Sequence, residues 1–244
     1  MPKITELLFD CDNTLVLSEE LAFEACAGLA NEILEKHGKT ERYTGDQLIK
    51  DFVGQNFRGM MVNLQKIHDF QMEPDEFEGY VKEEENAVIK KLLEKGQPCV
   101  GANEELQKLY DSKKYGMAVV SSSALRRVKA SIEKVGQDQY FSPDHIFSAA
   151  TSLGKPTSKP DPAVYLHAMK VIGVQPEECI AVEDSKSGAL AAVRAGIHTI
   201  AYVGSYHGEQ KQKEVAKMLT DLGAKYVMWT WADFPECLAK VEAE

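Results

Sequence analysis

Hydrophobic and polar positions along the chain form two kinds of pattern: short apolar runs, and longer stretches with apolar residues at helical spacing. The runs that predict strands lie at residues 4–9, 116–120, 145–150, 179–182, 198–203 and 226–229. Between them, apolar residues at helical spacing predict helices, residues 104–112 and 162–172 among them. Strands that alternate with helices are typical of βαβ units. The pattern therefore predicts an α/β fold with a doubly wound, three-layer parallel sheet.

One long stretch, residues 17–97, breaks this alternation. Apolar residues recur at helical spacing from Leu21 to Ile33, and the remainder keeps helical patterns with charged faces. We therefore expect a helical cap domain at residues 17–97. It is inserted into an α/β core domain made of residues 1–16 and 98–244.

Composition narrows the class of protein. The chain has 244 residues, of which 44% are hydrophobic and 27% charged, with a formal net charge of -10. An acidic surface repels nucleic acid and anionic membranes, so we expect neither as a partner. The five cysteines show no CxxC spacing, and no leader or membrane-spanning run is evident. These features favour a cytoplasmic protein, which we expect to be a monomer or a weak homodimer.

Candidate chemistry is concentrated where the apolar runs end. In an open parallel sheet, ligands bind outside the carboxyl ends of the strands. The polar residues found there, or in the loop before the 162–172 helix, are Asp10, Asp12, Ser121, Ser122, Lys159, Glu183 and Asp184. Together they offer carboxylates, hydroxyls and one ammonium group at one edge of the sheet.

These groups suit phosphoryl transfer. Carboxylate oxygens hold Mg²⁺, and a carboxylate can also attack phosphorus to form an acyl-phosphate. A second carboxyl group two residues later can protonate the leaving alkoxide and then activate water. Hydroxyl, backbone N–H and ammonium groups stabilise the charge on the transferred phosphoryl group.

Four motifs occur in a fixed order along the chain. They are Asp10-Cys11-Asp12-Asn13-Thr14, Ser121 at the end of an apolar strand, Lys159-Pro160, and Glu183-Asp184-Ser185 with Gly188. With these motifs the chain resembles the haloacid dehalogenase-like hydrolase superfamily, in the subfamily with a helical cap after the first motif. The resemblance covers the core from Ile4 to Gly196.

The resemblance implies a role for each motif residue. Asp10 is expected to be the nucleophile and Asp12 the general acid and base, while Ser121 and Lys159 contact the phosphoryl group. Magnesium is expected to be held by Asp10, Asp12, Glu183 and Asp184. Ser122 and Asn13 are expected in the substrate site, where backbone N–H groups after Ser121 and Asp10 donate to phosphate. The family often has glycine at the position of Asn13, a small departure because asparagine tolerates turns.

The cap supplies weaker candidates for substrate binding. Gly54 permits a tight turn or a close approach, and Gln55 and Arg58 offer groups for hydroxyls or phosphate. The alternative is a polar helix start with Arg58 on the surface, and both interpretations stay open.

We therefore expect a magnesium-dependent phosphatase that hydrolyses a small phosphomonoester, a sugar or polyol phosphate, through an aspartyl-phosphate. One alternative is a β-phosphoglucomutase-like mutase, disfavoured because Ala22 stands where those mutases have histidine. Asp12 argues against dehalogenation, and the absence of lysine from Leu17 to Glu35 argues against a phosphonatase. A catalytically silent binding module is the alternative outside enzymes.

Overall fold

The computed structural model describes residues 3–52 and 55–244. Contacts within the chain divide it into two compact units. One consists of Met1–Leu17 and Gln97–Glu244, and the other of Ser18–Gly96. The first is an α/β unit and the second is helical.

The α/β unit is built on a six-stranded parallel sheet in the order β5-β4-β1-β6-β7-β8. The strands are β1 (Glu6–Phe9), β4 (Gly116–Ser121), β5 (Ile146–Ser148), β6 (Cys179–Glu183), β7 (His198–Tyr202) and β8 (Tyr226–Met228). From β1 the chain moves outward to β5, then returns to β6 on the other side of β1 and moves outward again. This is the doubly wound order, which places the ligand crevice beside β1. The predicted fold class is confirmed.

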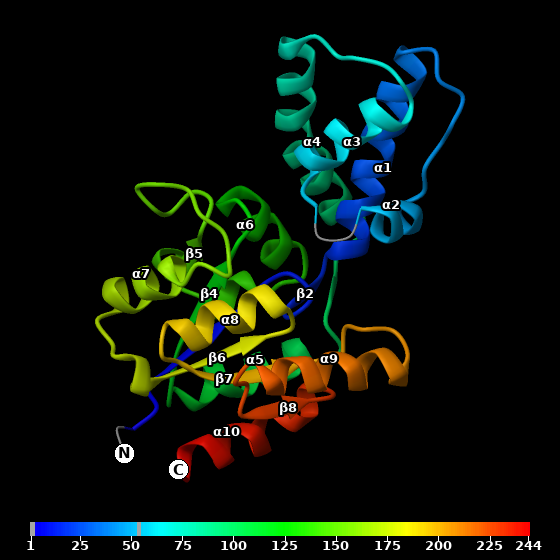
Figure 1. The fold of residues 1–244 in the computed structure, drawn as a ribbon. Coiled ribbons are helices and arrows are strands. Elements are labelled where there is room, and N and C mark those ends of the chain that lie inside the picture. The colour runs from blue at the N-terminus through cyan, green and yellow to red at the C-terminus, as the bar shows by residue number, and fades with distance from the viewer. Residues whose placement is uncertain (1–2, 53–54) are drawn as a thin grey trace. The chain divides into compact units, whose positions relative to one another are not determined.

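Helices cover both faces of the sheet (Figure 1). Leu7 and Phe9 pack with α5 (Ala102–Ser112), α6 (Leu125–Lys134) and α10 (Phe234–Glu242). Leu8, which points to the opposite face, packs with α7 (Ala163–Ile172) and α8 (Lys186–Arg194). Alternate residues of a strand point to opposite faces, so one short strand serves both layers. The two layers bury all four residues of β1.

Some elements of this unit escape the sequence pattern. Strands β2 (Val16–Leu17) and β3 (Gln97–Pro98) form a short antiparallel ribbon. Two residues per strand are too few to show a period. Helices α9 (Glu209–Asp221) and α10 were not assigned from the sequence either.

The helical unit contains α1 (Glu19–Lys36), α2 (Gly45–Asp51), α3 (Phe57–Ile67) and α4 (Pro74–Lys95). Its core is formed by apolar side chains of all four helices, with Ile33, Leu34, Leu48, Leu64, Val88 and Leu92 fully buried. Helix α2 begins with a capping box, in which Thr44 and Gln47 satisfy each other's backbone N–H groups.

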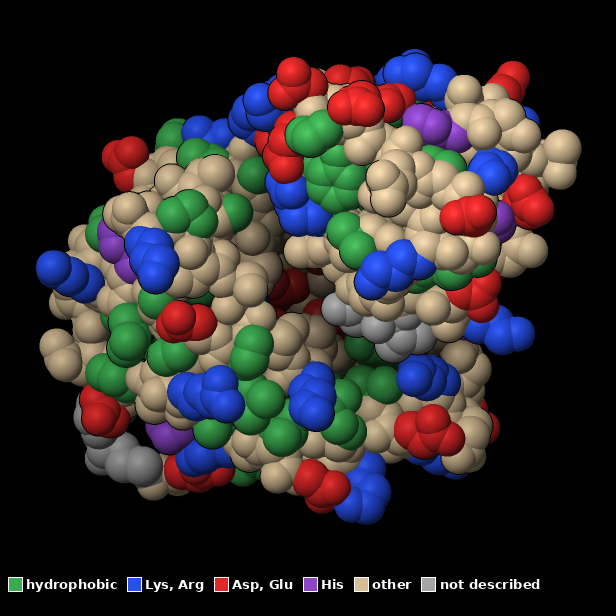
Figure 2. All heavy atoms as spheres, turned by 45° about the horizontal axis from the view of Figure 1, so that its top comes forward, with side chains coloured by type: hydrophobic (Ala, Val, Ile, Leu, Met, Phe, Trp, Pro, Cys, Tyr) green, Lys and Arg blue, Asp and Glu red, His purple; other side chains and the backbone are tan. Residues whose placement is uncertain are grey.

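Charged side chains of both signs are interspersed over the face drawn in Figure 2. Within residues 3–52 and 55–244, no helix is both long enough and apolar enough to cross a bilayer.

Candidate active site

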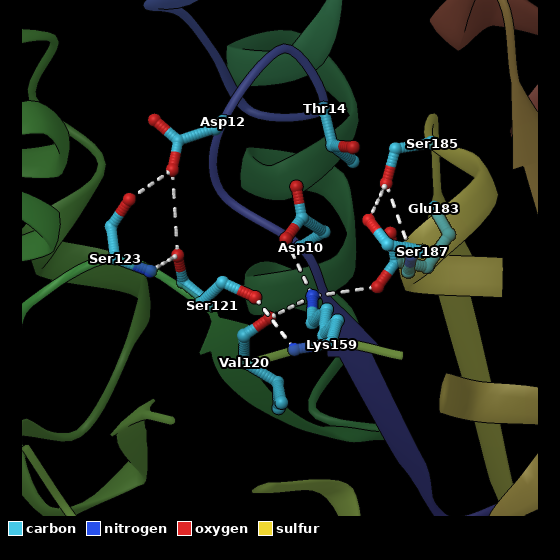
Figure 3. A network of polar contacts seen from close by, with 12 residues as sticks. Asp10, Asp12, Thr14, Val120, Ser121, Ser123, Lys159, Glu183, Ser185 and Ser187 are labelled. Atoms are coloured by element: carbon cyan, nitrogen blue, oxygen red, sulfur yellow. Dashed lines mark hydrogen bonds and ion pairs between the residues drawn. The ribbon is translucent and has the colours of Figure 1, made fainter. Parts of the chain in front are cut away.

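The carboxyl ends of the adjacent strands β4, β1 and β6 gather the polar residues that the sequence singles out. Asp10 follows β1, Ser121 closes β4, and Glu183 closes β6 with Asp184 next in the chain. The backbone N–H of Asp10 donates to the carbonyl oxygen of Val182 at 3.0 Å, which ties Asp10 to the neighbouring strand. Figure 3 shows the side chains of Asp10, Ser121 and Glu183, which come together from separate strands.

Lys159 lies at the centre of this cluster. Its Nζ donates to Oδ1 of Asp10 (2.6 Å), to Oε1 of Glu183 (2.6 Å) and to the carbonyl oxygen of Val120 (2.7 Å). The hydroxyl of Tyr165 also donates to Oε1 of Glu183, at 2.5 Å, and its ring lies 5.1 Å from the ammonium nitrogen. The side chain of Lys159 is 3% exposed. A buried ammonium group is therefore held between two carboxylates, with a carbonyl as its third acceptor.

Burial and neighbouring charges together set the pKa values of Asp10 and Lys159. Burial raises the pKa of Asp10 to about 7, against the lowering effect of Lys159 and with the help of the negative charges of Glu183 and Asp12. Burial alone lowers the pKa of Lys159, but Asp10 and Glu183 outweigh it and raise this pKa above its ordinary value. The ion pairs therefore keep Lys159 charged, while Asp10 sits among more negative charge than one lysine neutralises.

Three carboxylates are placed to share a cation. One oxygen each of Asp10, Glu183 and Asp184 lies within 4.8 Å of the others. Oε2 of Glu183 is buried and has no hydrogen-bond partner among the described residues. It lies against Gly188, where a Cβ atom would overlap it. An all-oxygen donor set of this kind fits a hard divalent ion such as Mg²⁺.

Asp12 occupies the other side of the site (Figure 3). Its Oδ2 accepts hydrogen bonds from Oγ of Ser123 at 2.7 Å and from Oγ of Ser121 at 3.5 Å. Its Oδ1 pairs with Nη2 of Arg127 at 2.9 Å. Both carboxylate oxygens of Asp12 therefore face the loop and helix that follow β4.

Ser122 and Asn13 have local structural contacts. Oγ of Ser122 accepts a hydrogen bond from the backbone N–H of Lys159 at 3.1 Å, which links the second and third motifs. Asn13 adopts a left-handed conformation, with φ of 57°, and its backbone N–H donates to the carbonyl oxygen of Val16 at 2.7 Å. Asparagine adopts this conformation more readily than most residues, which explains why it can replace glycine here.

Asp184 is contacted both at its carboxylate and at its backbone carbonyl. Oγ1 of the buried Thr14 donates to Oδ1 of Asp184 at 3.5 Å, and the Tyr206 hydroxyl donates to its backbone carbonyl oxygen at 3.2 Å. The last residue of the first motif therefore supports the fourth.

Comparison with known proteins agrees with this geometry. A family model described as haloacid dehalogenase-like hydrolase matches residues 7–202. The chain belongs to this family. It is 31% identical to the phosphorylated carbohydrates phosphatase of Thermotoga maritima over 80% of this chain and 82% of that protein. It is 27% identical to the 6-phosphogluconate phosphatase of Escherichia coli over 94% and 96% of the two chains.

A solved structure shares both the fold and part of the sequence. It is a haloacid dehalogenase-like protein of unknown function from Agrobacterium tumefaciens, 27% identical to this hydrolase, with a TM-score of 0.74. The match covers 99% of this chain and all of that one. The family and the enzyme class that the motifs predict, a phosphatase of the haloacid dehalogenase-like hydrolases, are confirmed.

The candidates in the helical unit of the hydrolase have partners of their own. Gly54 lies outside the described residues. Oε1 of Gln55 accepts a hydrogen bond from Nδ2 of Asn63 at 2.7 Å. Arg58 makes two hydrogen bonds to the carboxylate of Glu78, at 2.6 and 2.7 Å, in a pair whose side chains are each 48% exposed. A substrate contact from Gln55 or Arg58 stays a prediction.

Sequence reasoning missed several residues of the site. Tyr165 and Arg127 contact motif side chains, and Tyr206 contacts the backbone of Asp184, but these three residues belong to no motif. Thr14 belongs to the first motif, which gave it no role of its own. Arg127 alone left a signal, because a basic residue in the first turn of a helix opposes the helix dipole.

Proposed function

We propose that this hydrolase is a magnesium-dependent phosphatase that cleaves a small phosphomonoester through an aspartyl-phosphate. The observation that carries the proposal is the 2.6 Å contact between Nζ of Lys159 and Oδ1 of Asp10, at a strand end shared with the Asp10–Glu183–Asp184 cluster. A carboxylate held beside a buried cation and a metal-binding cluster is suited to attack an anionic phosphoryl group.

The side chains of Asp10, Glu183 and Asp184, with the backbone carbonyl of Asp12, would hold the Mg²⁺ ion. The bound ion supplies positive charge that offsets the repulsion between these carboxylates and the phosphoryl oxygens. Burial raises the pKa of Asp10 to about 7, so each added cation favours the ionised form that attacks.

In the first half-reaction, an Asp10 carboxylate oxygen forms a bond to phosphorus as the bond to the substrate alcohol breaks. The leaving oxygen takes a proton from the carboxyl group of Asp12. Ser121 donates a hydrogen bond to the phosphoryl group and Lys159 neutralises its charge. In the second half-reaction, Asp12 takes a proton from water, which attacks phosphorus and releases phosphate from Asp10.

The substrate class that we propose is a sugar or polyol phosphate. The support comes from relatives named for phosphorylated carbohydrates and for 6-phosphogluconate, both matched over most of their length. We propose that the helical unit acts as a cap that closes over such a substrate, with Gln55 and Arg58 among its contacts.

The first test is phosphate release from a panel of phosphorylated sugars, polyols and small acids, with Mg²⁺ or with EDTA. We expect release by the wild type with Mg²⁺ only, and a loss of at least about a thousandfold in Asp10→Asn. Calorimetric titration with Mg²⁺ gives a second readout, in which Asp184→Asn should bind the ion more weakly. Substantial turnover in Asp10→Asn would contradict the assignment of the nucleophile.

A further inference from the structure

A feature of the site that the four motifs do not include is the pairing of Asp12 with Arg127. Nη2 of Arg127 lies 2.9 Å from Oδ1 of Asp12, and Oγ of Ser123 donates to Oδ2 at 2.7 Å. We propose that Arg127 is a positioning residue, which fixes the Asp12 carboxyl group where it can protonate the leaving group. The inference rests on the proposed function, in which Asp12 is the general acid.

The helix that carries Arg127 does not explain why an arginine stands there. Helix α6 has no acidic residue in its first turn, and both Arg126 and Arg127 lie in that turn. The N-terminus of a helix carries partial positive charge, so a cation there is disfavoured by roughly 0.3–1 kcal/mol. The carboxylate of Asp12 offsets this charge for Arg127. The contact with Asp12 therefore explains the presence of an arginine at this position better than the stability of α6 does.

The support for Arg127 is rigid. Val128 and Ile132, on the buried side of α6, are 1% and 0% exposed within the core below the sheet edge. Asp12, in contrast, lies in the loop after β1, and its side chain is 28% exposed. A partly exposed carboxyl group in a loop can adopt several rotamers. Contacts to both of its oxygens, one of them from a charged donor on a packed helix, restrict it to one.

These contacts hold the carboxyl group of Asp12 beside the expected position of the phosphoryl group. Oδ2 of Asp12 lies 3.5 Å from Oγ of Ser121, the hydroxyl that we propose donates to the phosphoryl group. A general acid must reach the leaving oxygen within hydrogen-bond distance. A displacement of about 1 Å in a reacting group can reduce the rate about a hundredfold. Loss of Arg127 should therefore harm the step that needs a proton.

Leaving groups that differ in their need for a proton provide the test. p-Nitrophenyl phosphate expels a stabilised phenolate, whereas an alkyl phosphate, the best one from the panel above, requires protonation. The quantity to compare is kcat/KM, because it includes the expulsion of the alcohol but not the hydrolysis of the aspartyl-phosphate. For Arg127→Gln we expect a loss of about 10- to 100-fold on the alkyl phosphate and less than about threefold on p-nitrophenyl phosphate.

The chain offers a matched control in the same turn of α6. Arg126→Gln removes the same charge from an exposed neighbour, and we expect less than about a twofold change on either substrate. Arg127→Lys retains the charge but not the forked geometry, and should recover part of the activity on the alkyl phosphate. Equal losses on both substrates in Arg127→Gln would overturn the positioning role and indicate general structural damage.

Two further variants separate this inference from the proposed function. Asp12→Asn should show the same selectivity for leaving groups with a larger loss. If Asp12→Asn harms both substrates equally, Asp12 is not the general acid and the proposed mechanism fails, whatever Arg127→Gln shows. If Arg127→Gln does not fold, Ser123→Ala removes the 2.7 Å hydrogen bond to Oδ2 of Asp12 and must show the selective loss; an unselective result would count against the proposal.

Discussion

The α/β unit and the helical unit treat polar side chains differently. Among the described residues, the polar and charged side chains that are buried lie in the α/β unit, apart from Ser18. The ion pairs of the helical unit include Arg58–Glu78 and Lys95–Glu24, whose side chains are between 41% and 52% exposed. Burying a charge costs free energy unless the charge is paired, so the presence of buried charges in the α/β unit requires an explanation.

The difference shows which charged side chains carry information about function. A buried Lys159 between Asp10 and Glu183 contributes little net stability, since desolvation opposes the attraction. We attribute its presence to the phosphoryl transfer that we propose at the strand ends. Exposed pairs such as Arg58–Glu78 contribute about 0–1 kcal/mol and fit any solvated helix surface, so they carry little information about function.

The largest effect should follow from removing the buried cation. Lys159→Met leaves Asp10 and Glu183 buried without their partner, and we expect a loss of about 3–5 kcal/mol in the free energy of unfolding. Turnover should fall at least about a hundredfold. Urea unfolding and phosphate release measure the two effects. Arg58→Met is the matched control, and a similar loss of stability in both variants would remove the contrast between the units.

The six strands of the parallel sheet, and the gathering of the motif residues at its edge, could be predicted because both depend on simple regularities. A buried strand such as Cys179–Glu183 is an uninterrupted apolar run, and parallel topology brings its end next to Asp10. Side chains that approach only through tertiary packing leave no such pattern. Tyr165 reaches Glu183 from the first turn of α7, and Tyr206 reaches Asp184 from the loop after β7. Their contacts depend on helix orientation and loop path, which local sequence does not specify.

A second effect comes from a buried carboxylate at the opposite end of β1. Glu6 is 5% exposed, and burial raises its pKa to about 7 from an ordinary 4.5. Between pH 4.5 and 7 the unfolded chain releases this proton while the folded protein retains it, so stability falls as the pH rises. The loss amounts to roughly 3 kcal/mol above pH 7. Glu6→Gln should therefore be more stable than the wild type at pH 8 and nearly equal at pH 4.5 in urea unfolding.

The same measurement separates the contribution of Glu6 from that of Asp10 at the candidate site. Asp10 also has a raised pKa and contributes a slope of the same sign in both proteins, so the difference between them isolates Glu6. Glu24→Gln, in the helical unit, is the exposed control. The hydrogen bond from Lys95 lowers the pKa of Glu24, so this carboxylate stays ionised and its loss should leave the profile unchanged between about pH 5.5 and 8. Phosphatase activity of Glu6→Gln should remain within about twofold of the wild type. A pH-independent difference in stability would contradict the raised pKa.

Two glycines allow a smaller comparison between the units. A Cβ atom at Gly188 in α8 would overlap the carboxylate of Glu183, whereas one at Gly79 in α4 would meet nothing within 4 Å. We expect Gly188→Ala to cost about 1–3 kcal/mol and to weaken Mg²⁺ binding, because Glu183 must move. Gly79→Ala should instead stabilise the helix by about 0.5–1 kcal/mol. Thermal unfolding and Mg²⁺ titration decide both, and unchanged Mg²⁺ affinity in Gly188→Ala would argue that Glu183 does not support the ion.

The smallest effect on stability is expected at Arg58 of the helical unit. Arg58→Gln breaks an exposed pair and should change the free energy of unfolding by less than about 1 kcal/mol. If the guanidinium binds substrate, KM rises several-fold while kcat is unchanged, which is the result we expect for a group that binds substrate and transition state alike. Steady-state kinetics on the best substrate of the panel measure both constants.

Glu78→Gln separates this role from that of the ion pair itself. It breaks the same two hydrogen bonds but leaves the guanidinium of Arg58 in place. If Arg58 binds substrate, the loss of its competing carboxylate should leave KM unchanged or lower it. A KM that rises equally in both variants would show that the pair only supports the helical unit. The charged groups that the proposed chemistry requires, Asp10, Asp12 and Lys159 among them, would then lie in the α/β unit.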